Sequence, residues 1–255
     1  MKYIYVANWK MNLSFDESID YCNSYGNALQ KLSDSAAKII ICPSFVALAP
    51  MATLLKNSTI TLGAQNCSEH EFGAYTGEVS ALSIAQTGAT YCIVGHSEQR
   101  IYHNETTEKI INKIKLLHRH NITPIICIGE TEKDFLSNQT LTALAQQLEP
   151  ILITFDNRPY YAKATKGLSE DGQKSIIIAY EPVWSIGTNT IPTPEQLTKV
   201  FTWLQLQLHG HTIQLLYGGS VNPNNIVELK KIPLINGFLI GGASTDFEEL
   251  KKIIE

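Results

Sequence analysis

The sequence has little net charge and no cluster of basic residues. Its 255 residues include 20 lysines and arginines against 24 aspartates and glutamates, a formal charge of −4. Proteins that bind nucleic acids or anionic membranes draw much of their affinity from clustered Lys and Arg. The composition therefore argues against both kinds of partner. It leaves open a small phosphorylated ligand, which local charge and backbone N–H groups can hold.

Long hydrophobic runs are also lacking. No apolar stretch approaches the roughly 20 residues of a membrane span. The N-terminal stretch of residues 1–7 is too short for a signal peptide and is interrupted by Asn8. Apolar residues still make up 44% of the chain and charged residues 17%, which favours a large buried core over disorder. We expect a soluble protein.

Cysteine is sparse and unpatterned, with no CxxC pair. The five cysteines are Cys22, Cys42, Cys67, Cys92 and Cys127. Three of them, at 42, 92 and 127, lie in or beside apolar runs, so we expect buried thiols that pack as small hydrophobic groups. Because such usage is typical of a reducing compartment, we expect a cytoplasmic location.

Eight short apolar runs, each followed by a loop and a longer amphipathic stretch, predict parallel strands covered by helices. They span residues 3–7, 38–42, 60–64, 91–94, 123–128, 175–179, 213–217 and 238–240. A helix is expected over 105–118, and another after a capping box at 193–196 with proline in the first helical position. The pattern best fits an α/β protein that is a single (β/α)8 barrel domain over residues 1–255. A doubly wound open sheet is the alternative that periodicity alone leaves open.

Polar residues follow several of these strands, where barrel enzymes place their catalytic groups. Lys10 follows the first strand, His96 the fourth and Glu181 the sixth. Together they could supply a cation, an electrophile and a base to one cavity. Each also has a plainer interpretation, because a single histidine is often structural and single Lys and Glu side chains are often solvated.

Small residues follow the last two strands. Ser220 comes after the seventh and Gly241-Gly242 after the eighth, where barrels often bind phosphate through backbone N–H groups and a short helix N-terminus. Residues 245–254 are expected to form that closing helix. The combination predicts a phosphorylated substrate and acid–base chemistry.

Seven segments together closely resemble the triosephosphate isomerase family. They are residues 7–12, 73–78, 94–98, 127–130, 179–184, 217–221 and 237–244, in family order along nearly the whole chain. The resemblance implies a TIM barrel that interconverts D-glyceraldehyde 3-phosphate and dihydroxyacetone phosphate through an enediolate, in glycolysis and gluconeogenesis. It implies no metal and no cofactor.

Carried onto this sequence, the resemblance makes Glu181 the base that moves a proton between neighbouring carbons. Neutral His96 would polarise the carbonyl and shuttle protons between the two oxygens. Lys10 would stabilise the developing oxyanion and the phosphate charge, and Asn8 would orient the substrate. An enediolate needs such preplaced donors because a carbon acid beside a carbonyl is weak.

The phosphate would bind the backbone N–H groups of Gly187, Ser220 and Gly242, with Gly241 beside them. Residues 182–192 match the family's lid, which excludes water from the reacting intermediate.

Four further positions match supporting residues of the family. Glu98 would position Lys10 or His96, and Cys127 would pack near Glu181 rather than react. Residues 73–78 resemble a loop that inserts into a second subunit, so Thr76 would brace the partner's Lys10 and the protein would be a homodimer. Tyr217 would take part in closing the lid.

The lid departs from the family pattern at Asn189 and Pro192, where Gly and Ala are common. In the family, the tyrosine at the position of Tyr217 bonds to the backbone N–H at the position of Pro192. Proline has no N–H, so we expect the lid to be held by a different contact.

Two other functions remain as alternatives. One is a non-catalytic barrel that binds sugar phosphates as a sensor or scaffold; Lys10, His96 and Glu181 argue against it, because a pure binder does not need the base. The other is an aldolase-type barrel with Lys10 in a Schiff base.

Overall fold

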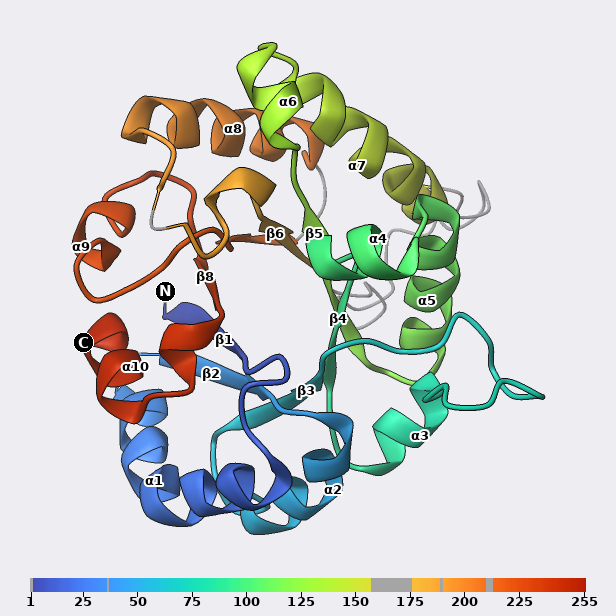
Figure 1. Ribbon diagram of the computed structural model, residues 1–255, viewed down its shortest axis with the longest axis vertical. Helices are drawn as coiled ribbons and strands as arrows, with labels where there is room; N and C mark the ends of the chain where they lie inside the picture. Colours follow the sequence, from blue (N-terminus) through green and yellow to red (C-terminus); the bar gives the residue numbers. More distant parts are fainter. Residues whose placement is uncertain (1, 36, 157–175, 189, 210–212) are drawn as a thin grey trace, which may run out of the picture.

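The chain folds into a closed barrel of eight parallel strands, viewed along the barrel in Figure 1. The computed structural model describes residues 2–35, 37–156, 176–188, 190–209 and 213–255. The strands are β1 (Tyr3–Asn8), β2 (Ala37–Cys42), β3 (Thr61–Ala64), β4 (Tyr91–Val94), β5 (Thr123–Ile128), β6 (Ile176–Tyr180), β7 (Ile213–Tyr217) and β8 (Gly237–Ile240). They pair in sequence order, and β1 also pairs with β8, which closes the ring. The (β/α)8 prediction is confirmed, and the open sheet is wrong.

Helices surround the barrel (Figure 1). In the described part of the chain they are α1 (Phe15–Ser35), α2 (Phe45–Leu54), α3 (Ala81–Gln86), α4 (Ser97–His103), α5 (Thr107–Arg119), α6 (Glu132–Leu136), α7 (Thr140–Asp156), α8 (Pro194–Gln207), α9 (Ile226–Leu229) and α10 (Phe247–Ile254), with 3-10 turns η3 (Val183–Ser185) and η4 (Gly242–Ser244). None of the described helices is long and apolar enough to cross a membrane.

The predicted elements agree closely with the observed ones. The sixth strand begins at Ile176 and includes Tyr180, because Tyr180 pairs with both Ile128 and Tyr217. The helix expected over 105–118 begins two residues later, since Thr106 caps it. The closing helix expected over 245–254 begins two residues later, at Phe247, after its cap Asp246, and the 3-10 turn η4 precedes it. The sequence also predicts a long surface excursion over residues 155–174, most of which lies outside the described residues.

The pleat of the strands decides which residues reach the site. Ile4 and Val6 of β1, and Ala179 of β6, belong to the inner layer of buried side chains within the barrel. Since side chains alternate along a strand, the next inward positions are Asn8 and Glu181. The barrel therefore delivers these two polar side chains to its C-terminal mouth.

Candidate active site

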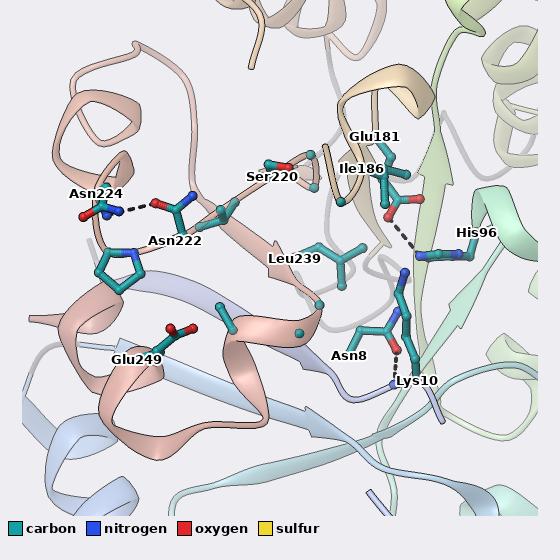
Figure 2. A pocket seen from close by; sticks show the side chains of 18 of the residues that line it. Asn8, Lys10, His96, Glu181, Ile186, Ser220, Asn222, Asn224, Leu239 and Glu249 are labelled. Atoms are coloured by element: carbon teal, nitrogen blue, oxygen red, sulfur yellow. Dashed lines mark hydrogen bonds and ion pairs between the residues drawn. The ribbon is translucent and has the colours of Figure 1, made fainter. Parts of the chain in front are cut away.

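A pocket of about 600 Å³ opens at the C-terminal mouth of the barrel. All eight residues expected to act in catalysis or substrate binding line it: Asn8, Lys10, His96, Glu181, Gly187, Ser220, Gly241 and Gly242. Figure 2 shows Lys10, His96 and Glu181 converging on one side of this space, with Ser220 across from them. The fold thus brings together residues from five different strand ends.

His96 is the N-cap of α4, and its Nδ1 accepts the backbone N–H of Glu98 at 3.2 Å. Since an acceptor nitrogen carries no proton, this contact assigns the neutral ring with its proton on Nε2. Nε2 lies 3.3 Å from Oε1 of Glu181. The local fold therefore points an imidazole N–H, not an unprotonated nitrogen, into the pocket.

Glu181 is almost fully enclosed, with its side chain only 3% exposed. Its backbone N–H donates to the Ile128 carbonyl at 2.8 Å, which anchors it directly after β6. Its Oε2 has no hydrogen-bond partner among the described residues. A buried carboxylate oxygen with unused lone pairs is suited to accept a proton from a bound substrate.

Cys127 lies behind this carboxylate in the inner layer of the barrel. Burial, and then the neighbouring Glu181, raise the pKa of its thiol well above the ordinary value. A thiol held in its neutral form is a poor nucleophile, which agrees with a packing role. All five cysteines are buried and free, which confirms the prediction for the three in apolar runs.

Lys10 is fixed through both its backbone and its side chain. Its φ of 51° is unusual for a residue other than glycine. Its N–H donates to Oδ1 of Asn8 at 3.2 Å, and its carbonyl accepts from Gln65 at 2.7 Å. Nζ lies 2.6 Å from Oε1 of Glu98. The ammonium group is therefore oriented before any substrate arrives.

The other end of the pocket is built from small residues. Gly241 and Gly242 lead into η4, and Ser220 and Gly187 contribute from the loop after β7 and from the lid. Backbone N–H groups at such a turn suit an anion, because they offer donors with no side chain in the way.

Residues 182–192, the segment expected to act as the lid and called the lid below, are described except for Asn189. Ile186 and Gly187 line the pocket, and the Trp184 ring stacks on Phe135 with centroids 4.2 Å apart. The Trp184 indole donates to Oε1 of Glu130 at 2.9 Å. Glu130 is itself buried, and burial raises the pKa of its carboxyl.

The remaining supporting residues lie outside the pocket lining. Glu98 contacts Lys10 and His96, as above. Tyr217 lies beneath the lid, where its hydroxyl is 3.2 Å from Oγ of Ser185. Thr76 is exposed on the loop between β3 and α3, away from the pocket of its own chain. Asn189 lies outside the described residues.

Three residues in or next to the site were not predicted from the sequence. Leu239 lines the pocket, and its position two residues before Gly241 on an inward-facing row was the available signal. Arg100 donates to the carbonyls of Gly95 and Cys127 and so ties the end of β4 to β5. Ser185 is buried within the lid, and no sequence pattern marked it.

The described residues contain no group of three or more His, Cys, Asp or Glu side chains arranged to hold a metal ion. The pocket offers a buried carboxylate, an imidazole N–H and an ammonium group around one cavity.

This fold and this site define an enzyme of the (β/α)8-barrel class. A family model described as triosephosphate isomerase matches residues 3–255. Triosephosphate isomerase of Bacteroides fragilis is 38% identical over 261 residues, covering 100% of this chain and 98% of that protein. The protein of the same name from Coxiella burnetii is 39% identical, covering 97% and 94%.

The crystal structure of triosephosphate isomerase from Bartonella henselae matches with a TM-score of 0.81 at 31% identity, covering 99% of this chain and 98% of that one. The chain belongs to the triosephosphate isomerase family. Its activity is the interconversion of glyceraldehyde 3-phosphate and dihydroxyacetone phosphate, a step of glycolysis.

Proposed function

We propose that Glu181, His96 and Lys10 carry out this isomerisation in the roles that their positions suggest. Glu181 takes the proton from the carbon next to the carbonyl and returns it to the neighbouring carbon. The 3.3 Å contact between Glu181 Oε1 and His96 Nε2 supports this most directly, because it places the base and the proton donor on one small cavity.

His96 acts as a neutral hydrogen-bond donor. Its Nε2–H polarises the carbonyl oxygen and then passes protons between the two oxygens of the enediolate. The N–H of Glu98 at Nδ1 supports this role, because it occupies the nitrogen that a second proton would need.

Lys10 and the backbone donors hold the negative charges. Lys10 stabilises the oxyanion that develops during proton abstraction, and Asn8 orients the substrate beside it. The N–H groups of Gly187, Ser220 and Gly242, with Gly241 adjacent, bind the phosphate. Residues 182–192 serve as the lid that excludes water from the enediolate.

The test is isomerisation of glyceraldehyde 3-phosphate by the wild type and by Glu181→Asp. Shortening the side chain withdraws the carboxylate without removing it, so kcat should fall by about 100-fold or more. The matched control is Glu132→Asp at an exposed position of α6. A wild type that binds dihydroxyacetone phosphate without turning it over would support the non-catalytic alternative, and unchanged turnover in Glu181→Asp would refute the role of the base.

We also propose that the protein is a homodimer of single-domain barrels. The side chains of Met11, Phe72 and Tyr102 are 95%, 87% and 73% exposed, an unusual amount of apolar surface near the ends of β1, β3 and β4. The loop between β3 and α3 extends away from the barrel in Figure 1. It would insert into the partner, with Thr76 against the partner's Lys10.

Sedimentation would test the dimer. We expect the wild type at twice the 28.3 kDa of the chain, and Phe72→Asp as a monomer. A wild type that sediments as a monomer at micromolar concentration would refute the proposal.

The protein is also proposed to be cytoplasmic. The five free, buried thiols support this location, because thiols stay reduced there.

A further inference from the structure

A fully buried hydroxyl lies in the middle of the lid. Ser185 has no exposed surface, and its Oγ is within hydrogen-bond distance of three groups. Oγ lies 2.5 Å from the carbonyl of Thr190, 3.2 Å from the hydroxyl of Tyr217 and 3.4 Å from the backbone nitrogen of Ser220. This hydroxyl therefore bonds both within the lid and to β7 and the loop after it.

The direction of each bond follows from counting protons. A carbonyl can only accept, so the single proton of Ser185 goes to Thr190. The Tyr217 hydroxyl and the Ser220 N–H must then both donate to Ser185 Oγ. One donation and two acceptances use the full capacity of a hydroxyl, and the contact with Ser220, at 3.4 Å, is the longest of the three.

The three partners belong to different parts of the site. Thr190 is in the second half of the lid, Tyr217 ends β7, and Ser220 lies in the loop after β7. The Ser220 N–H is also one of those proposed to bind phosphate, so a bound phosphate would take over this donation and leave the Ser185 contacts with Thr190 and Tyr217. The Ser220 hydroxyl also donates to the Ser185 carbonyl at 2.6 Å. The lid is therefore joined to the phosphate loop through the backbone and the side chain of one residue.

Two neighbouring residues favour this contact between the lid and the loop after β7. Pro192, at the end of the lid, has no N–H with which to bond the barrel. At Gly219, a Cβ would come within 2.2 Å of the Tyr217 hydroxyl and 2.8 Å of Ser185 Oγ. The two hydroxyls thus pack directly against the glycine backbone, in space that any larger residue would fill.

We propose that Ser185 is a positioning residue that latches the lid to the loop after β7. Its hydroxyl holds Ile186 and Gly187 against the pocket and links the position of the lid to the phosphate loop. The proposal rests on the proposed role of residues 182–192 as the lid. Ser185 contacts no reacting atom, so it acts through the lid alone.

The test compares two substrates, glyceraldehyde 3-phosphate and glyceraldehyde, which lacks the phosphate. If Ser185 acts by joining the lid to the loop proposed to bind phosphate, its loss should slow the reaction only of a substrate that carries a phosphate. For Ser185→Ala, kcat/KM with the phosphorylated substrate should fall about tenfold or more, since more than one hydrogen bond is lost. With glyceraldehyde, kcat/KM should change by less than about twofold.

Tyr217→Phe removes one donor to the same oxygen and serves as the second variant. Because both changes break one shared contact, the loss in Ser185→Ala/Tyr217→Phe should be smaller than the product of the two single losses. Thr198→Ala is the control: its hydroxyl bonds only within α8, to the Pro194 carbonyl, and neither substrate should be affected.

Equal losses on both substrates would overturn the latch and leave Ser185 a residue of general structural importance. Unchanged kinetics in Ser185→Ala, or fully independent effects in the double variant, would also overturn it. A wild type that isomerises neither substrate would instead overturn the proposed catalytic roles, so the two failures are distinguishable.

Discussion

Lys10 and Glu98 form an ion pair across the mouth of the barrel, with Nζ and Oε1 2.6 Å apart. The pair links the turn after β1 to the first turn of α4. The same Glu98 donates its backbone N–H to His96, so one residue holds two of the three groups proposed for catalysis. The carboxylate is 43% exposed and the lysine 24%, which indicates that the pair contributes orientation more than stability.

Glu98→Gln should therefore lower kcat about tenfold, because the Lys10 ammonium loses the charge that fixes its position. The melting temperature should hardly change. The control is Glu228→Gln, which removes an ion pair of the same 2.6 Å length between exposed side chains on α9 and the residues after it. Equal kcat values for the two variants would show that the Lys10–Glu98 pair does not orient the site.

Gly218 has no side chain, and the side chain of Glu181 occupies the space beside it. A Cβ at this position would lie 2.8 Å from Cγ of Glu181, so Gly218→Ala should displace the carboxylate and lower kcat by about 100-fold. Gly26→Ala is the matched change in α1, where the nearest atom to a new Cβ is 3.8 Å away. It should leave kcat unchanged and stabilise the fold by about 0.5–1 kcal/mol. Full activity in Gly218→Ala would mean that the base tolerates displacement.

The helix after the lid begins with a reciprocal cap. The Thr193 hydroxyl accepts the N–H of Gln196, and the Gln196 side chain accepts the N–H of Thr193 at 2.7 Å. Thr193→Ala should cost about 1 kcal/mol of unfolding free energy in urea titrations, because one end of the box is lost. Thr193→Ser keeps the hydroxyl and should restore most of it. Equal stability of both variants would contradict a contribution from the cap.

Glu71 joins the loop between β3 and α3 to the end of α5. A hydrogen bond with His120, at 2.7 Å, and then the charge of Arg119 lower the pKa of Glu71 below its ordinary 4.5. Because the folded pKa is depressed, the contribution to stability is complete above the ordinary value and is lost as pH falls through the lowered one. The melting temperatures of the wild type and Glu71→Gln should differ near neutral pH and converge as the pH falls below the lowered pKa of Glu71. A difference that persists at the acidic end would show that the carboxylate charge is not its cause.

Most of the barrel could be predicted because buried parallel strands give continuous apolar runs that stand out in sequence. The runs at 91–94, 123–128 and 213–217 match β4, β5 and β7 at both ends. Errors of a residue or two arose at element ends, where pairing or capping decides rather than hydrophobicity. Tyr180 is an example, because its two partner strands extend β6 past the last aliphatic residue.

The candidate site could be predicted as a set of residues but not as a geometry. Position after a strand, together with the family resemblance, indicated Lys10, His96 and Glu181. Neither could show that the His96 ring accepts the Glu98 N–H, because that contact depends on how α4 begins. Ser185 escaped notice for a similar reason: its importance comes from three groups that are distant or irregular in sequence.

Because β1 pairs with β8, the protein can become active only after the last strand of the chain has been synthesised. Ala7 pairs with Ile240, and the Lys10 side chain comes within 3.7 Å of the Cβ position of Gly241, so the first and last site residues meet only at the ring's seam. A growing chain that has produced Lys10, His96 and Glu181 still lacks the eighth strand that completes the barrel. Return of turnover after dilution from denaturant therefore requires that β1 and β8 have paired, whereas helical signal can return earlier, from helices that form locally.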